Sequence, residues 1–374
     1  MRILELCLSR DLGGLELYAY RCTEALAETD HVVGVIHPQG RLRGYFEKAK
    51  LPVLFMRHRF RPLPLLAARR LARIIDRESV EVIHVHHGKD LPLAAFAKAM
   101  SRSKPALVYT RQMQLTRPKQ DAYHRFLYRQ LDRLLTITEA LAASARDRLP
   151  ASDRHKVATL YYGVKAPTAT LTPEERSQIR AEWGLPEDGF VVGLFGRKEE
   201  AKGQHLLLEA LAQLRGRGAT VCAILVGHAM NPAYASRLED TVKTLGLESQ
   251  VAFRDFVDGP QRWMQACDCV ALTTYEETFG LVLAEAMRAG VAVLGSNSGG
   301  VPEIIEHEHS GLLFTPGDSA ALAEQLLRLQ ADEGLRASLA RQGKEKADRL
   351  FAERPHYAAL REQFAALISA TGPR

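Results

Sequence analysis

Two glutamates in the last third of the chain, Glu277 and Glu285, have the type and spacing to bind a polyhydroxylated ligand. An apolar run before Glu277 predicts a buried strand, and the spacing from Leu281 to Ala289 predicts a helix. Gly280 would then lie at a strand-to-helix turn, where free backbone N–H groups favour an anion. Carboxylates accept hydrogen bonds from hydroxyls, so this segment has the features to hold a sugar nucleotide.

The alternative is an ordinary strand, loop and helix with two solvated glutamates. Phe279-Gly280-Leu281 between the carboxylates and Gly299-Gly300-Val301-Pro302-Glu303 after them argue against it. With these residues the segment resembles the donor-site signature of family-4 glycosyltransferases, which are retaining enzymes with the GT-B fold. The resemblance covers nearly the whole chain.

The resemblance implies an α/β fold with two Rossmann-like domains facing each other across a cleft. It implies that Glu277 holds sugar hydroxyls and Glu285 the ribose, while the backbone at Phe279, Gly280 and Leu281 fixes the sugar and phosphate. It also implies a nucleotide-sugar donor, UDP-sugar being favoured, with no cofactor. No Asp-x-Asp occurs in the chain, so we expect no metal requirement.

Arg197 and Lys202 form a second candidate group, in Gly196-Arg-Lys-Glu-Glu-Ala-Lys-Gly203. The segment follows a predicted strand and precedes a predicted helix, which is the usual ligand position in open α/β sheets. Two cations there can neutralise a pyrophosphate, although a solvated charged loop has the same composition. The family has a Gly-Arg-x-x-x-x-Lys-Gly element here that binds the donor diphosphate, so we predict that role for both side chains.

Two further donor-side candidates depend mainly on the resemblance. Gly13-Gly14 lies between a strand and a helix, beside Arg10 and Asp11, and a plain tight turn is equally compatible with it. In the family a Gly-Gly loop at this place closes over the diphosphate. Arg254 ends an apolar run that corresponds to the family's base-binding loop, so we predict that it contacts the nucleotide.

His86 closes the run Ile83-His84-Val85-His86-His87, and Lys89 and Asp90 open the next loop. A zinc site would need further ligands at suitable spacing, and none follows. We predict that His86 faces the cleft, because the family often has a histidine here, and that Lys89 and Asp90 contact the acceptor.

Four more acceptor candidates follow the next strand: Arg111, Lys119, Asp121 and His124. Many family members have a histidine near the first of these positions, where this chain has Arg111-Gln112. Asp121 and His124 are one helical turn apart and share a face, although a plain helix surface would have the same spacing. A second departure from the family is Tyr162, in a position commonly occupied by asparagine.

The order of patterns along the 374 residues predicts two α/β domains with parallel sheets. Residues 1–165 would bind the acceptor, residues 166–352 the nucleotide-sugar, and residues 353–374 would form a helix that packs on the N-terminal domain. The predicted boundary is the loop-like segment 162–173. The predicted strands are 3–8, 32–36, 53–56, 82–85, 106–109, 134–138, 191–195, 221–226, 251–253, 269–273, 292–295 and 311–314.

Charge and cysteine content restrict the class of protein. Residues 1–165 hold 29 lysines and arginines against 16 aspartates and glutamates, whereas the rest holds 21 against 28, which suggests an anionic partner for the first half. The five scattered cysteines, the lack of a membrane-length apolar run and Glu5 in the place of a signal-peptide core indicate a cytoplasmic protein. The positive charge of the first half is compatible with nucleic acid as the anionic partner, but no RNA- or DNA-binding motif is present.

A basic tract runs from Arg57 to Arg61 and continues at Arg69, Arg70, Arg73 and Arg77. With Phe60, Leu65 and Leu66 nearby it suits an anionic membrane surface or a phosphorylated acceptor, and a merely solvated face is the alternative.

We therefore predict a retaining, metal-independent glycosyltransferase that acts on an anionic glycan or glycolipid. Lipopolysaccharide core or another cell-envelope polysaccharide is the first expectation for the acceptor. The alternatives are a sugar-nucleotide epimerase of the same architecture and a non-catalytic glycan- or membrane-binding protein. Nucleotide release that depends on an acceptor separates the three.

Overall fold

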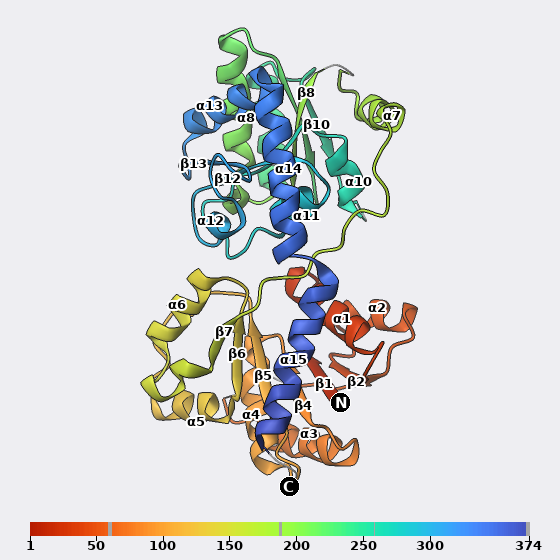
Figure 1. Ribbon diagram of the computed structural model, residues 1–374, viewed down its shortest axis with the longest axis vertical. Helices are drawn as coiled ribbons and strands as arrows, with labels where there is room; N and C mark the ends of the chain where they lie inside the picture. The colour runs from red at the N-terminus through yellow and green to blue at the C-terminus, as the bar shows by residue number, and fades with distance from the viewer. Residues whose placement is uncertain (59–61, 187–188, 258, 372–374) are drawn as a thin grey trace. The chain divides into compact units, whose positions relative to one another are not determined.

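Two parallel sheets organise the chain, each in its own structural unit (Figure 1). The computed structural model describes residues 1–58, 62–186, 189–257 and 259–371. Unit 1 comprises Met1–Tyr161 and Arg354–Arg374, and unit 2 comprises Tyr162–Glu353.

Unit 1 contains a seven-stranded sheet in the order β3-β2-β1-β4-β5-β6-β7. Its strands are β1 (Arg2–Cys7), β2 (His31–Ile36), β3 (Val53–Phe55), β4 (Val82–Val85), β5 (Ala106–Arg111), β6 (Arg133–Thr136) and β7 (Val157–Thr159). Its helices are α1 (Gly14–Leu26), α2 (Leu42–Lys48), α3 (Leu65–Arg77), α4 (Leu91–Met100), α5 (Ala122–Gln130), α6 (Glu139–Arg148) and α15 (Glu353–Thr371).

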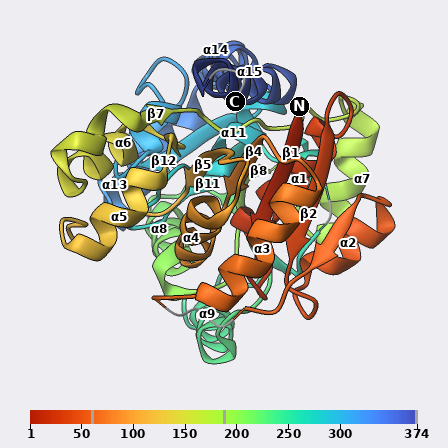
Figure 2. The same ribbon diagram turned by 90° about the horizontal axis from the view of Figure 1, so that it is seen from below.

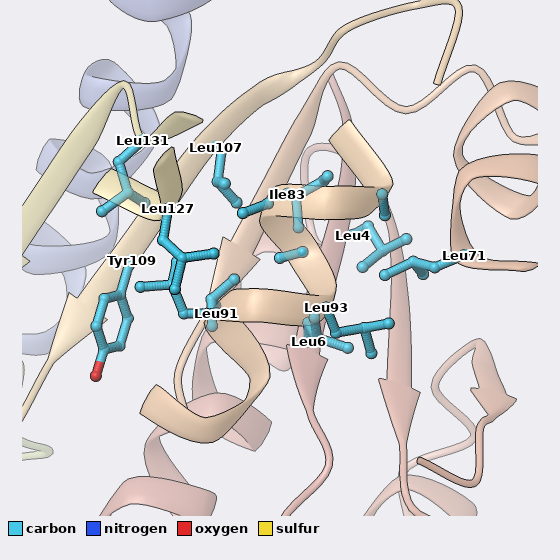
Figure 3. Close-up of a cluster of buried hydrophobic side chains, with 14 of the residues drawn as sticks. Leu4, Leu6, Leu71, Ile83, Leu91, Leu93, Leu107, Tyr109, Leu127 and Leu131 are labelled. Carbon is cyan, nitrogen blue, oxygen red and sulfur yellow. The ribbon is translucent and has the colours of Figure 1, made fainter. Parts of the chain in front are cut away.

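Side chains alternate between the two faces of this sheet, because successive strand residues point in opposite directions. Leu4 and Leu6 of β1 pack toward Leu71 of α3 and Leu93 of α4 (Figure 3). Each buried leucine of this kind stabilises the fold by about 2 kcal/mol relative to an exposed one. On the other face, α1, α2 and α15 cover the sheet, and the Phe364 ring of α15 lies 5.2 Å from the His84 ring.

Unit 2 contains a six-stranded sheet in the order β10-β9-β8-β11-β12-β13. Its strands are β8 (Phe190–Phe195), β9 (Val221–Val226), β10 (Val251–Arg254), β11 (Cys269–Leu272), β12 (Ala292–Ser296) and β13 (Leu312–Phe314). Its helices are α7 (Pro173–Trp183), α8 (Gln204–Gly216), α9 (Pro232–Thr244), α10 (Pro260–Gln265), α11 (Leu281–Arg288), α12 (Val301–Ile304), α13 (Ser319–Ala331) and α14 (Glu333–Leu350).

The predicted α/β class and two Rossmann-like sheets are confirmed, and each predicted strand run forms a strand. The sequence prediction missed β7, because this edge strand has only three residues and only Val157 is buried. The predicted C-terminal helix forms as α15. Among the described residues, none of the helices has both the length and the hydropathy that crossing a bilayer requires.

The strand orders show where each sheet can bind a ligand. In unit 1 the order reverses between β1 and β4, and in unit 2 between β8 and β11. Ligands of open α/β sheets bind at such switch points, outside the carboxyl ends of the strands. The loops after these four strands carry Gly13-Gly14, His86–Asp90, Arg197–Gly203 and Glu277–Gly280 respectively, so most of the predicted residues lie at switch points.

Candidate functional site

The loop after β8 is fixed to the end of β11 by close backbone approach at Gly203 and by a hydrogen bond from the Thr273 side chain. Lys202 ends a short 3-10 turn, and Gly203 follows it with φ +66°. A Cβ on Gly203 would lie 2.3 Å from the carbonyl oxygen of Thr273, so a side chain there would displace backbone. The Thr273 hydroxyl donates to the carbonyl oxygen of Lys202 at 2.8 Å. Lys202 is therefore held at one position beside β11.

Lys202 and Glu277 form an ion pair across the switch point of unit 2. Lys202 Nζ donates to Glu277 Oε2 at 2.8 Å, and the side chains are 22% and 20% exposed. Glu277 Oε1 accepts from the backbone N–H of Thr278 at 3.0 Å. The pair is reachable from solvent, and the ammonium group keeps further N–H donors for a ligand oxygen.

Gly299 and Gly300 fix the backbone of Glu277 from the other side. Gly300 N–H donates to the Glu277 carbonyl at 2.8 Å, and a Cβ on Gly299 would lie 2.0 Å from the same oxygen. The first glycine of the pair thus has a geometric reason, since no side chain at Gly299 fits against that carbonyl.

Gly280 has φ +95° and is the N-cap of α11, whose first turn presents backbone N–H groups. Phe279 is buried, and its ring packs against the rings of Tyr162 and Phe351 at 5.1 and 5.6 Å. Phe279 therefore anchors the loop through its side chain. Tyr162, the departure from the family, is an aromatic support for this anchor. Glu285 is partly exposed on α11, on the same face as Leu281.

Arg197 is placed near the turn but is not bound to the Lys202–Glu277 pair. Its guanidinium, 54% exposed, pairs with Glu199 at 3.0 Å. Its carbonyl oxygen accepts from the buried Gln204 side chain at 2.8 Å, and Gln204 Oε1 accepts from Tyr234 at 3.2 Å. These two supporting residues were not predicted, because their role depends on contacts between α8, α9 and the loop after β8.

Arg254 binds protein carbonyl groups in this structure. Its two terminal nitrogens donate to Phe253 O and Glu182 O at 2.8 and 2.6 Å. Beside it, the exposed ring of Phe256 stacks on His228, with centroids 5.1 Å apart and an interplanar angle of 19°. This stacked pair offers a flat apolar surface next to Arg254 and was not predicted from sequence.

In unit 1, Asp90 holds the start of the loop that contains Gly13 and Gly14. Asp90 is fully buried and its Oδ2 accepts from Leu8 N–H at 2.8 Å, at the end of β1. Its Oδ1 is buried without a hydrogen-bond partner. Gly13 is the N-cap of α1, which begins at Gly14. Asp90 is thus a positioning residue for this loop, with one carboxylate oxygen still unused.

The expectation that His86 faces a ligand is wrong. Its side chain is fully buried beneath α1, with Nε2 2.5 Å from Glu5 Oε2. Burial and the nearby His84 lower the pKa of His86 to about 4, so the imidazole is neutral near pH 7. Burial acts to raise the pKa of Glu5, but the charges and hydrogen bonds of the two histidines outweigh it and bring the pKa to about 2.

His84 completes this buried group, with Nδ1 2.9 Å from Glu5 and Nε2 2.7 Å from Thr110. Within the described residues, Cys22, His84 and His86 bring metal-type donor atoms within 4.8 Å of one another. Because both histidines already bind Glu5, the contacts favour a polar core rather than an ion site.

The remaining acceptor candidates form two local groups in unit 1. Arg111 is held by the Tyr109 hydroxyl at 3.1 Å and Gln114 O at 2.6 Å. Burial, then the charges of Arg117 and Arg111, lower the pKa of Lys119, so these cations lie close together. Such a cluster attracts an anion. Lys89 is exposed in the turn before α4.

Asp121 and His124 bind each other rather than only sharing a face. Asp121 is the N-cap of α5, accepts from His124 N–H at 3.0 Å and lies 2.6 Å from His124 Nδ1. The hydrogen bonds from His124 lower the pKa of the Asp121 carboxyl group. Helix capping accounts for this pair.

Basic residues missed as site candidates surround Asp90. Burial, then the charges of Arg10 and Arg57, lower the pKa of His37, and Asp90 acts in the opposite direction. Burial also lowers the pKa of His58, again opposed by Asp90. The residues after β1, β2, β3 and β4 thus converge on one edge of the sheet. Arg59, Phe60 and Arg61 of the basic tract lie outside the described residues.

Known proteins resemble both units. The family profile described as "Glycosyl transferases group 1" matches residues 175–346, and that described as "Glycosyltransferase Family 4" matches residues 12–166. The chain is 26% identical over 291 residues to the N-acetyl-alpha-D-glucosaminyl L-malate synthase of Bacillus anthracis, covering 76% of this chain and 74% of that protein.

Over 255 residues it is 31% identical to the D-inositol 3-phosphate glycosyltransferase of Salinispora arenicola, covering 65% of this chain. The match spans 56% of that relative, little more than half its length. A crystal structure of Anabaena HepE in complex with UDP and glucose superposes with a TM-score of 0.83 at 27% identity, covering 98% of this chain and 99% of HepE.

Proposed function

We propose, from the premise that this chain belongs to glycosyltransferase family 4 and has the GT-B fold, that it transfers a sugar from a UDP-sugar to an anionic glycan or glycolipid. The observation that carries the proposal is the Lys202–Glu277 pair at 2.8 Å, beside the Gly280 turn and at the switch point of unit 2. One cation for a diphosphate and one carboxylate for sugar hydroxyls then lie side by side.

For the donor, Lys202 and Arg197 stabilise the charge that develops on the departing diphosphate. Glu277 accepts hydrogen bonds from sugar hydroxyls, Glu285 from the ribose, and the backbone at Phe279–Leu281 fixes the sugar and phosphate. The first turn of α11 adds backbone N–H groups for a phosphate oxygen. The similarity to HepE, solved with UDP and glucose, supports a UDP-sugar.

For the chemistry, we propose transfer with retention at the anomeric carbon and without a metal ion. The departing phosphate oxygen takes the acceptor's hydroxyl proton on the face from which it leaves, and the acceptor oxygen forms the new bond to the anomeric carbon. The side chains needed are then cations for the leaving group rather than a carboxylate nucleophile, which agrees with Lys202 and Arg197.

For the acceptor, the basic edge of unit 1 supports an anionic molecule. The two relatives are named for L-malate and inositol 3-phosphate, which are both anions. We place the acceptor near Asp90, Lys89, Arg111 and Lys119, and propose a lipopolysaccharide-core or other envelope glycan at the cytoplasmic face of a membrane. Transfer to a small anion such as L-malate or inositol 3-phosphate would replace this assignment of the acceptor.

The test is release of the nucleoside diphosphate (UDP, GDP or ADP) from a panel of UDP-, GDP- and ADP-sugars, with lipopolysaccharide-core acceptors, L-malate or inositol 3-phosphate, each with and without EDTA. We expect release that requires one donor and one anionic acceptor, persists in EDTA and yields an α-linked product from an α-linked donor by NMR. Isomerisation of a donor without acceptor would instead indicate an epimerase, and no binding of any donor would exclude a transferase.

A further inference from the structure

Helix α3 has an outer face that the fold of unit 1 does not use. Its inner face buries Ala68, Leu71, Ala72 and Ile75 against the sheet and α4. The outer face carries four exposed arginines, Arg69, Arg70, Arg73 and Arg77. Figure 2 shows α3 on the outside of unit 1, next to α4.

Three of these charges are uncompensated. Arg77 pairs with Glu78 at 2.8 Å, but among the described residues no carboxylate forms an ion pair with Arg69, Arg70 or Arg73. Asp76 on the same helix is used elsewhere, because it accepts from the Ser101 hydroxyl and the Arg102 N–H. The face is therefore strongly cationic, because its charges are not neutralised by surface ion pairs.

Apolar side chains adjoin the charges. Leu66 is 88% exposed, Leu63 61% and Leu65 49%. Leu66 lies three and four positions before Arg69 and Arg70, so it shares their face. Singly exposed leucines are common, but three within four residues beside uncompensated arginines are typical of an interface with a partly apolar, anionic partner.

A groove on this face is suited to a phosphate group. Arg69, Ala72, Arg73, Asp76, Met100 and Arg102 line a space of about 570 Å³ between α3 and the end of α4. Three arginines against one aspartate line it, and a guanidinium matches a phosphate with two parallel hydrogen bonds. The exposed Met100 side chain adds an apolar wall, as a phosphate attached to an acyl chain would need.

The position of α3 connects this face to the acceptor edge of unit 1. The helix begins after the carboxyl end of β3, at the edge where Arg57, His58 and Asp90 lie. The Tyr123 hydroxyl of α5 donates to Pro62 O at 2.7 Å, so the start of α5 lies against the segment before α3. A membrane that covered α3 would bring its embedded glycolipids to the same edge.

We propose that the outer face of α3 docks on an anionic phospholipid bilayer, with Leu63, Leu65 and Leu66 entering the acyl boundary. The groove of Arg69, Arg73 and Arg102 holds one lipid phosphate. The inference rests on the proposed function in that it assigns a lipid-linked acceptor to the site in unit 1. Exposed leucines favour lipid over a soluble phosphorylated molecule or a nucleic acid, which need only the charge.

The test is co-sedimentation of the full chain with vesicles of phosphatidylcholine alone or with 30 mole percent phosphatidylglycerol. We expect binding only to the anionic vesicles, weakened at high salt. Arg69→Glu/Arg73→Glu should lower the affinity at least tenfold, since each arginine contributes about fivefold near an anionic surface. Leu65→Ser/Leu66→Ser should lower it several-fold while the salt dependence remains.

The matched control is Lys243→Glu/Arg341→Glu, which makes the same charge change at two exposed helix positions of unit 2. It should bind within twofold of the wild type. Absence of binding to anionic vesicles, or equal loss in the control, would overturn the inference, as would full competition by millimolar inorganic phosphate. UDP release with a water-soluble acceptor should be unchanged in Arg69→Glu/Arg73→Glu, so loss of lipid binding alone leaves the proposed function standing.

Discussion

The candidate sites of units 1 and 2 occupy equivalent places, at the carboxyl ends of central parallel strands, but they are built differently. In unit 2 close backbone approach fixes the site. A Cβ on Gly203 would lie 2.3 Å from the Thr273 carbonyl oxygen, and a Cβ on Gly299 would lie 2.0 Å from the Glu277 carbonyl oxygen. In unit 1 side chains fix the site, through buried Asp90 and the Glu5–His84–His86 group. A site held by backbone is suited to a constant part of a ligand, such as a diphosphate, and a site held by side chains can vary with the acceptor.

The largest expected effect is at Lys202. Lys202→Ala removes the cation that stabilises the leaving diphosphate, so kcat/KM for sugar transfer should fall on the order of 100- to 1,000-fold. Glu277→Gln keeps the shape of the side chain but not its charge, and it should lower kcat/KM by a similar factor. Steady-state UDP release measures both. Lys243→Ala, a solvent-exposed lysine on α9, is the control, and a Lys202→Ala enzyme within threefold of wild type would refute the role.

The second effect tests the backbone account in unit 2. Gly203→Ala places a Cβ against the Thr273 carbonyl at φ +66° and should destabilise the fold by about 3 kcal/mol. Gly218→Ala has a similar φ of +79° but open space, so it should cost about 1 kcal/mol. Urea unfolding compares them, and equal losses would show that backbone strain alone, not close approach, explains Gly203.

The third effect tests the side-chain account in unit 1. Burial is the main cause that lowers the pKa values of both His86 and His356 to about 4. The unfolded chain binds these protons near pH 6.5, so it holds more protons than the folded chain between about pH 6.5 and 4. The free energy of unfolding should therefore fall as the pH drops through that window, by about 1.4 kcal/mol per pH unit for each histidine.

Urea unfolding at pH 7, 6 and 5 measures this slope. His356 Nε2 lies 3.1 Å from the Tyr18 hydroxyl oxygen, and its Nδ1 lies 2.6 Å from Tyr161 O. His356→Gln should reduce the slope of the free energy of unfolding by the contribution of one proton, about 1.4 kcal/mol per pH unit. Glu5 adds to the loss only from about pH 4.5 to 2, where its own lowered pKa applies. A stability that does not change from pH 7 to 5 would contradict the buried neutral histidines.

The smallest expected effect is at Asp90, and it distinguishes binding of the acceptor from binding of the donor. Asp90→Asn can keep the hydrogen bond from Leu8 N–H through its amide oxygen, but it loses the negative charge on the unused oxygen. We expect about a tenfold higher KM for the acceptor and an unchanged KM for the donor. Asp121→Asn, which retains an N-cap side chain, should change neither. An equal rise in the KM for the donor would show that Asp90 only positions the loop and does not contact the acceptor.

The same contrast explains what could be predicted from sequence. In unit 2 the candidate site depends on short local patterns, so Lys202, Glu277 and Gly280 could be proposed from segments that resemble the family's donor-site elements, and the strand runs were regular enough to predict both sheets. Thr273, Gln204 and the Phe256–His228 stack were missed, because their roles arise from contacts between distant segments.

In unit 1 the sequence pattern misled at His86. A histidine at a strand end can point to either face, and the pleat turns this one under α1 toward Glu5. His37 was missed because it stands alone after β2, and Arg57 and His58, which both follow β3, were assigned only to the basic tract. The parallel sheet is what brings them together around Asp90. Strand-end polar residues on neighbouring parallel strands are the signal that could have found them.

Calorimetric titration with UDP tests the central claim most directly, because it needs neither the sugar nor the acceptor. Wild-type chain, Lys202→Ala and the Lys243→Ala control would be compared in buffer that contains EDTA. We expect wild type and control to bind UDP equally, and Lys202→Ala to bind at least tenfold more weakly, which corresponds to about 1.4 kcal/mol. Equal UDP affinity in all three proteins would contradict the assignment of the diphosphate to the Lys202–Glu277 site.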